Sequence, residues 1–155
     1  MAYKTSDKQP WRLYRGFCLN QERVIYIKFR AICENHLYSK AYSKGKRAVT
    51  SALAVYVLPD YAAKRLAKAN PEKKVVNRIG LTTSTKLGGA VTRSRCRRIM
   101  REGLRALEKE KTLKVGFLIV IAARSASVKL KSTEIKRQLD VAFTKLGMYA
   151  DTKTD

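Results

Sequence analysis

Histidine and cysteine are scarce in this sequence. It has one histidine, His36, and three cysteines, Cys18, Cys33 and Cys96, none of which forms a Cys-x-x-Cys pair. A structural zinc site needs four such ligands, usually paired at short spacings. Cys33 and His36 would share one face of a helix, but two ligands at that spacing reflect packing far more often than zinc binding. We therefore expect no metal site, and the odd number of unpaired cysteines indicates a reducing cytoplasm.

Long apolar segments are also missing. Residues 1–9 are polar, and the next apolar stretch, 11–17, is interrupted by Arg12 and Arg15. A signal peptide needs an unbroken apolar run, and a transmembrane helix needs about 20 consecutive apolar residues. The sequence therefore predicts a soluble intracellular protein with no membrane partner.

Acidic residues are few. The 155 residues include 34 Lys and Arg but only 12 Asp and Glu, which gives a formal net charge of +22 and a pI near 10.3. Hydrophobic residues make up 45% of the chain, enough for the core of one domain. The cations run from Lys4 to Lys153 rather than along one amphipathic segment, so a membrane surface is a poor partner. The excess favours nucleic acid over a merely soluble basic protein.

The few carboxylates do not gather in one segment. A two-metal nuclease site needs several acidic side chains close together, and general-base catalysis most often uses histidine. The sequence therefore shows no acidic cluster for a two-metal site and only one histidine, His36. The scattered carboxylates include Asp7, Asp60, Glu72, Glu102, Glu108, Glu110, Glu134 and Asp140.

The hydrophobic pattern predicts three helices and three strands. The helices are expected over 36–44, 90–107 and 133–146. The strands are expected over 50–58, 78–84 and 115–122. Asn35 and Ser132 are the expected N-caps of the first and last helices, and 61–74 is interpreted as a solvated connection with a helical turn. This order predicts an α+β chain folded as a two-layer α/β sandwich.

We divide the chain into three parts. The domain is expected over 31–150, after an N-terminal extension of unknown role over 1–30 and before a polar tail over 151–155.

Three tyrosines are placed to share one surface. Tyr38 and Tyr42 lie four residues apart, so they share a face of the first helix. Tyr56 alternates with Ala52 and Ala54 on the shallow face of its strand. Each tyrosine alone could be an ordinary half-buried core residue. Together, beside a strand face too small to fill a core, they predict a stacking platform for single-stranded RNA.

The segment 90–107 carries the densest positive charge. Plotted at 100° per residue, its apolar side chains fall on one side and its basic side chains on the other. Like charges four residues apart destabilise a helix, and guanidinium groups bind phosphate in a bidentate manner, so RNA is the expected counter-charge. A solvated face would mix both signs and use mostly lysine. The apolar side has Cys96, Ile99, Met100, Gly103, Ala106 and Leu107. The basic side has Ser94, Arg97, Arg98, Arg101 and Arg105, flanked by Arg93 and Arg95.

The turn before this helix also favours an anion. Lys86, Gly88 and Gly89 bring backbone N–H groups close to the positive end of the helix dipole. A phosphate would be stabilised there, although two glycines can also simply make the turn.

Residues 78–102 read RIGLTTSTKLGGAVTRSRCRRIMRE. This segment resembles the signature of the bacterial ribonuclease P protein, which has a lysine and glycine turn, Ala-Val, Arg-Asn-Arg, two further basic residues and Arg-Glu. The resemblance extends over roughly 32–149. Three departures stand out: Ser94 replaces the usual Asn, Thr85 replaces a usual lysine, and residues 1–30 lie outside the pattern.

The resemblance implies a fold like the second domain of ribosomal protein S5, with the arginine helix in a left-handed crossover. General chirality rules alone would predict a right-handed one. It also implies the protein subunit of an endoribonuclease that matures tRNA 5′ ends. In that family the protein binds a catalytic RNA, and it holds the 5′ leader of precursor tRNA in a cleft between the first helix and the sheet. Mg²⁺ is held mainly by the RNA, no protein residue is catalytic, and no protein partner is required.

The resemblance assigns roles residue by residue. The RNA-binding residues are Lys86, Gly88, Arg93, Ser94, Arg95, Arg97, Arg98, Arg101 and Arg105. The leader-binding residues are Tyr38, Tyr42 and Tyr56.

Two other functions remain open at this point. A structural ribosomal protein, or another RNA-binding protein, has a similar charge and fold class, although the arginine signature argues against it. A self-sufficient protein nuclease is disfavoured by the scattered carboxylates and the single histidine.

Overall fold

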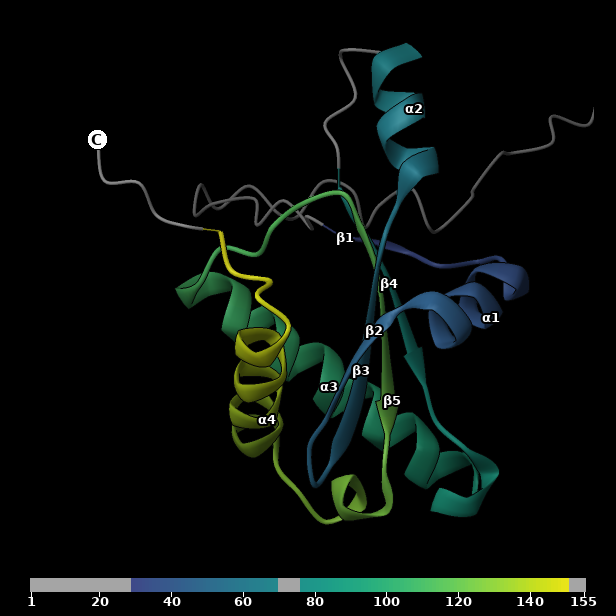
Figure 1. The fold of residues 1–155 in the computed structure, drawn as a ribbon. Helices are drawn as coiled ribbons and strands as arrows, with labels where there is room; N and C mark the ends of the chain where they lie inside the picture. The colour runs from purple at the N-terminus through teal and green to yellow at the C-terminus, as the bar shows by residue number, and fades with distance from the viewer. Residues whose placement is uncertain (1–28, 70–75, 151–155) are drawn as a thin grey trace, which may run out of the picture.

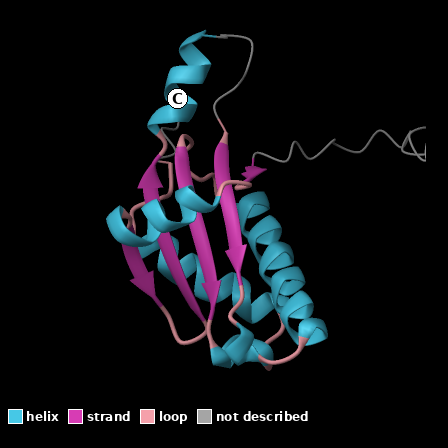
Figure 2. Cartoon of the chain, turned by 90° about the vertical axis from the view of Figure 1, so that its right-hand side faces the viewer, coloured by secondary structure: helices cyan, strands magenta, loops and turns pink. Residues whose placement is uncertain are grey.

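The computed structural model describes residues 29–69 and 76–150. A five-stranded sheet carries helices on both faces (Figure 1, Figure 2), and the predicted α+β class is confirmed. The strands are β1 (Phe29–Ala31), β2 (Lys46–Val49), β3 (Leu53–Pro59), β4 (Asn77–Thr82) and β5 (Phe117–Ala123). The α-helices are α1 (Asn35–Lys44), α2 (Tyr61–Ala69), α3 (Ala90–Glu110) and α4 (Ser132–Lys145). Two short 3-10 turns are η2 (Thr85–Leu87) and η3 (Ser125–Val128).

The strands lie in the order β1-β4-β5-β3-β2. β4 is parallel to both β1 and β5, whereas β3 runs antiparallel to both β5 and β2. Because β4 and β5 are parallel neighbours in the sheet, α3 connects them as a crossover. Followed through Figures 1 and 2, this crossover is left-handed, as the resemblance implied.

The main core lies between the sheet and helices α3 and α4. Successive residues of a strand point to opposite faces, so Leu53 and Val55 of β3 both face these helices. Ile119 and Ile121 do the same in β5, and Phe143 of α4 is fully buried among them. This core holds α3 firmly against the sheet.

Helix α1 covers the other face with smaller side chains. Leu37 and Ala41 of α1 pack on Val120 of β5. The ring of Tyr38 lies against Gly80 of β4, and a Cβ at residue 80 would come within 2.4 Å of that ring. Glycine at this position therefore allows α1 to approach the sheet closely.

Three elements are not apparent from the sequence. β1 and β2 are short edge strands, and the charged residues of β2 hide the alternation that marks a strand. α2 covers the first part of the connection expected over 61–74, where only a helical turn was predicted, and residues 70–74 lie outside the described residues. β1 begins at Phe29, two residues before the expected domain start. The rest of the expected extension, 1–28, and the tail, 151–155, lie outside the described residues.

Both predicted N-caps are wrong by one residue. Asn35 and Ser132 are the first residues of α1 and α4, and the N-cap positions are Glu34 and Lys131. At α4 the side chain of Glu134 accepts a hydrogen bond from the Lys131 N–H at 3.1 Å. The helix start therefore gains its polar contact from within the first turn and needs no serine cap.

Candidate RNA interface

Helix α3 has one buried side and one exposed side, as its periodicity predicts. The buried residues are Cys96, Ile99, Met100, Gly103, Leu104 and Leu107. Leu104 extends the predicted apolar side, whereas Ala106 is only partly buried. The predicted basic side is exposed at Ser94, Arg97, Arg98, Arg101 and Arg105, and Arg95 and Glu102 are exposed as well. The core thus fixes the arginines on a surface that faces away from it.

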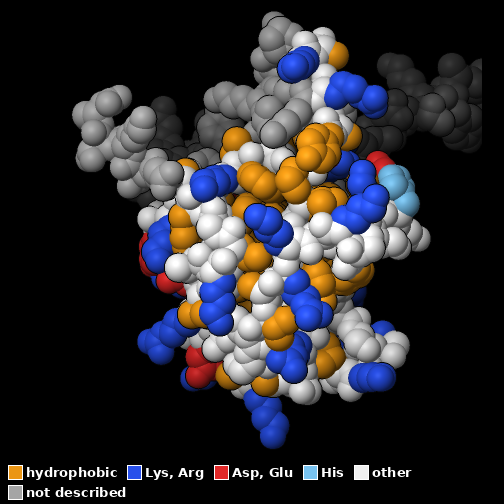
Figure 3. Space-filling model, in the orientation of Figure 1, with side chains coloured by type: hydrophobic (Ala, Val, Ile, Leu, Met, Phe, Trp, Pro, Cys, Tyr) orange, Lys and Arg blue, Asp and Glu red, His pale blue; other side chains and the backbone are white. Residues whose placement is uncertain are grey.

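Most of these arginines lack an acidic neighbour. Arg98 Nε lies 4.0 Å from a carboxylate oxygen of Glu102. Among the residues that the structure describes, Arg97, Arg101 and Arg105 form no ion pair. In Figure 3, Lys and Arg side chains spread over the visible face, whereas the acidic side chains lie toward its margins. Such uncompensated charge on a rigid helix favours a polyanionic partner.

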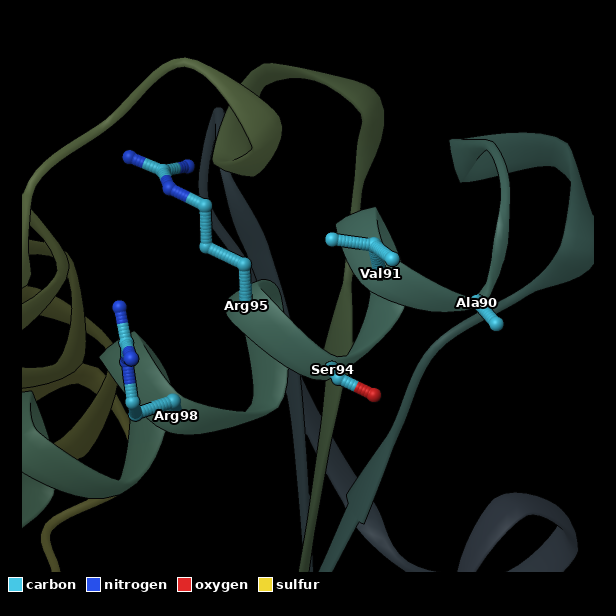
Figure 4. A pocket seen from close by; sticks show the side chains of 5 residues that line it. All are labelled: Ala90, Val91, Ser94, Arg95 and Arg98. Carbon is cyan, nitrogen blue, oxygen red and sulfur yellow. The ribbon is translucent and has the colours of Figure 1, made fainter.

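Arg95 differs from the other arginines. One of its amino groups donates to the carbonyl oxygen of Val128 at 2.5 Å, and the other to that of Leu130 at 3.4 Å. In Figure 4 its side chain extends toward the η3 turn, away from Ser94. Arg95 is nevertheless exposed, whereas Arg93 is partly buried, and the Arg93 Nε has no hydrogen-bond partner among the described residues. Arg95 therefore ties α3 to the segment before α4, in addition to any RNA contact it makes.

The turn into α3 presents backbone groups to solvent. Ser84 Oγ accepts a hydrogen bond from the Lys86 N–H at 3.3 Å, and the Gly88 N–H donates to the carbonyl of Thr85 at 3.1 Å. Gly88 has φ +124°, which only glycine adopts readily. The N-cap residue, Gly89, has no side chain to cap the first N–H groups of α3. These donors are therefore available to an anion, as the sequence predicts.

A shallow hollow lies beside this helix start. Val91 is 85% exposed there, so an apolar surface adjoins the arginines. The hollow, drawn in Figure 4, is lined by Ala90, Val91, Ser94, Arg95 and Arg98.

The opposite end of α3 is held by ion pairs to α4. Glu110 pairs with Lys136, and Lys111 pairs with Asp140 at 2.7 Å. The hydroxyl of Tyr149 donates to the same Asp140 carboxylate at 2.5 Å, and burial together with this bond raises the pKa of Tyr149. These ion pairs hold the last residue of α3 and the residue after it, whereas Arg97, Arg101 and Arg105 lie before them and form no ion pair with a described residue.

Strand register lines up two rows of residues across the α1 face of the sheet. The outer row, across β2, β3, β5 and β4, is Val49, Ala54, Ala122 and Thr82. The inner row, nearer α1, is Arg47, Tyr56, Val120 and Gly80. Because the outer row has small side chains, the surface is shallow beyond the end of α1.

Tyr42 and Tyr56 meet beside this shallow row. Their ring centroids are 4.8 Å apart with planes at 84°, an edge-to-face pair. The hydroxyl of Tyr42 lies 2.9 Å from Thr82 Oγ1, and Tyr42 is 41% exposed. Arg47, exposed and directly opposite Tyr56 on β2, adds a cation that the sequence pattern does not show. The sequence prediction missed Arg47 because only strand register places it there.

Tyr38 makes different contacts from Tyr42 and Tyr56. Its ring packs on Gly80, and its hydroxyl donates to the carbonyl of Ile32 at 3.3 Å. Burial, followed by the nearby Tyr42, raises the pKa of the Tyr38 hydroxyl. Of the three predicted leader-binding tyrosines, the structure therefore brings Tyr42 and Tyr56 into contact, whereas Tyr38 packs against the sheet.

Two general features of the described residues bear on partners. No helix within 29–69 and 76–150 is long and apolar enough to cross a membrane. In the same two ranges, no three His, Cys, Asp or Glu side chains are grouped so that they could hold a metal ion.

The family model for ribonuclease P matches residues 28–147. The chain belongs to this family. It is 31% identical over 122 residues to the ribonuclease P protein component of Clostridium acetobutylicum, covering 79% of this chain and 92% of the relative. It is 29% identical over 130 residues to that of a Thermoanaerobacter species, covering 84% and 96%.

Solved ribonuclease P proteins share the fold. The Staphylococcus aureus protein superposes with a TM-score of 0.59 at 22% identity, covering 77% of this chain and 97% of its own. The Thermotoga maritima protein gives 0.53 at 18% identity, covering 67% and 86%. As a ribonuclease P protein component, the chain has an RNA partner and belongs to tRNA processing. The earlier alternative of a structural ribosomal protein is thereby set aside.

Proposed function

We propose that the chain binds the catalytic RNA of ribonuclease P through the start of α3 and through η2. The observation that carries this is the row of exposed arginines on a helix whose other side is core, of which Arg97, Arg101 and Arg105 form no ion pair with a described residue. Arginine forks bind backbone phosphates in a bidentate manner, and the uncapped N–H groups after Gly88 add donors for a further phosphate. Lys86 lies exposed in the same turn.

The second part of the proposal concerns the precursor tRNA. Tyr42 and Tyr56 offer ring surfaces beside the shallow row of Ala54 and Ala122, and Arg47 lies alongside. Aromatic rings stack unpaired bases of any sequence, as a subunit that serves many leaders requires. This surface would hold the 5′ leader while the holoenzyme cleaves it from the tRNA.

Catalysis is assigned to the RNA subunit. Among the described residues, no three His, Cys, Asp or Glu side chains are grouped so that they could hold a metal ion. We propose that Mg²⁺ is held mainly by the RNA and activates the cleavage there. The protein contributes binding and positioning, and none of its residues is proposed to react.

Identification of the bound RNA tests this function. The protein is purified with its RNA from cells, and the RNA is sequenced. We expect one species several hundred nucleotides long, and reconstitution with that species should cleave the leader from precursor tRNA in Mg²⁺. Recovery of ribosomal RNA, or cleavage by the purified protein without RNA, would contradict the proposal.

A further inference from the structure

Helix α2 stands clear of the body of the protein. It rises from the end of the sheet where β3 ends and β4 begins (Figures 1 and 2). Within the described residues, no other helix or strand packs substantially against it. Isolated helices shorter than about 12 residues are marginal in water, and α2 has nine. Packing against the described helices and strands therefore does not explain why this segment is helical.

The base of α2 is fixed to the sheet by a buried ion pair. The Asp60 carboxylate accepts hydrogen bonds from Arg78 Nε at 2.5 Å and from an Arg78 amino group at 2.8 Å. It also accepts from the Ala63 N–H at 3.2 Å, which caps the helix. Burial acts to raise the pKa of Asp60, but the bonds from Arg78 and Ala63 outweigh it and lower that pKa. α2 therefore projects from the sheet in a defined direction.

One face of α2 carries a ring and two cations. Tyr61, Arg65 and Lys68 stand at i, i+4 and i+7, within about 60° on the helix. Tyr61 is 69% exposed, and Arg65 and Lys68 are exposed as well. The helix has no acidic residue, and neither cation forms an ion pair with a described residue. A ring beside two cations is suited to stack one base and bind the adjacent phosphates.

α2 starts on the same face of the sheet as the tyrosine pair. Along β4, Arg78 alternates with Ile79 and so shares the face of Gly80 and Thr82. Asp60 lies four residues beyond Tyr56, roughly 13 Å along the strand direction. Figure 2 shows α1 crossing this face below α2. The exposed lysines on α1 are Lys40 and Lys44.

We propose that α2 binds the 5′ portion of long leaders, beyond the nucleotides held at Tyr42 and Tyr56. The ligand is single-stranded RNA, recognised by stacking on Tyr61 and by phosphate contacts to Arg65 and Lys68. This inference rests on the proposed leader site, because the leader reaches α2 only after passing the tyrosine pair and α1.

A leader-length series with the assembled holoenzyme tests the inference. Precursor tRNAs with leaders lengthened stepwise are titrated against wild type and against Tyr61→Ser/Arg65→Gln/Lys68→Gln. Wild type should gain affinity once when the leader covers the tyrosine pair and again when it reaches α2. The triple variant should lose only the second gain, so that long leaders bind at least about fivefold more weakly. Its salt dependence for long leaders should fall by about 0.7 units per lost phosphate contact.

A charge-matched control lies on the opposite face of the sheet. Arg137→Gln/Lys145→Gln removes two exposed cations from α4 and should leave the leader-length profile unchanged. The α2 proposal is overturned if the triple variant binds every leader like wild type, or loses affinity equally for long, short and absent leaders. If instead the proposed leader site at Tyr42 and Tyr56 is wrong, wild type itself would gain no affinity at any leader length, which distinguishes this failure from failure of the α2 proposal. Circular dichroism confirms that each variant is folded.

Discussion

The two faces of the sheet differ in how much hydrophobic core covers them. On the α3 and α4 face, Leu53, Ile121 and Phe143 are fully buried in one continuous core. On the α1 face, a smaller cluster around Val120 and Ala41 covers only part of the strands. Both faces come from the same strands, and the size of alternate residues alone distinguishes them. One face supplies stability, and the other leaves surface free for a ligand.

Helix α3 contributes both to the stability of the core and to the charged surface. α3 contributes a buried side to the deep core and an exposed side of arginines to solvent. Repulsion between those arginines destabilises the helix, and burial of residues such as Met100 and Leu107 offsets it. The buried side of α3 therefore stabilises the helix that carries the cationic surface.

The largest expected effect comes from a substitution in the core between the sheet and helices α3 and α4. Phe143→Ala should lower the free energy of unfolding by about 3–5 kcal/mol, because a fully buried aromatic ring is replaced by a cavity. Urea denaturation followed by circular dichroism measures the change. Tyr42→Ala on the shallow face is the comparison and should cost far less, because Tyr42 is 41% exposed. Equal losses in the two variants would show that the faces do not differ as described.

The next effect concerns the shallow face. Tyr42→Ala or Tyr56→Ala should weaken holoenzyme binding of precursor tRNA by ~1–3 kcal/mol for each base no longer stacked. Binding of mature tRNA, which has no leader, should stay nearly constant. Both affinities are measured with the same preparation, whose fold is checked by circular dichroism. Parallel losses for precursor and mature tRNA would return these tyrosines to a packing role.

A smaller effect is expected from substitutions of the α3 arginines, and it should differ between arginines proposed to bind RNA and Arg95, which also supports the fold. Arg97→Ala and Arg101→Ala should weaken binding to the catalytic RNA and lower the salt slope by about one unit or slightly less. Their melting temperatures should not change, since both side chains are exposed. Arg95→Ala should instead destabilise the fold by about 1 kcal/mol, because it loses bonds to two backbone carbonyls. An unchanged salt dependence in Arg97→Ala and Arg101→Ala would contradict the proposed interface.

Long periodic segments of the fold are predictable from the sequence, and short edge elements are not. The two sides of α3 and the alternation of Leu53, Val55 and Tyr56 follow from periods of 3.6 and 2. β2 has only four residues, two of them charged, so its pattern is lost. α2 depends on the bond between Asp60 and Arg78, which lie eighteen positions apart and meet only in the folded chain.

The same limit applies to the candidate site: side chains on a single helix could be placed from the sequence, whereas contacts between separate elements could not. The exposed arginines follow from one helix, so spacing places them correctly. Tyr38 and Tyr42 share a helix face by spacing. In the folded chain, however, the Tyr38 ring packs on Gly80 of the sheet, whereas the Tyr42 ring contacts Tyr56. Arg47 enters only through its register with Tyr56. The positions of these residues are determined by contacts between separate strands and helices, which the local sequence pattern does not show.

The smallest expected effect concerns Ser94, which replaces the asparagine usual in the family signature. Its hydroxyl accepts a hydrogen bond from Arg97 at 3.3 Å, and it lines the hollow with Arg98. An amide side chain is longer and has two donors as well as an acceptor, so Ser94→Asn can keep the Arg97 contact and add one to RNA. We expect this variant to bind the catalytic RNA as well as wild type or slightly better. Filter binding at several salt concentrations measures the affinity, with Ser94→Ala as the matched control. A tenfold loss in Ser94→Asn would mean that the surface around Arg97 and Arg98 is shaped for serine, and that the family's contact does not transfer to this position.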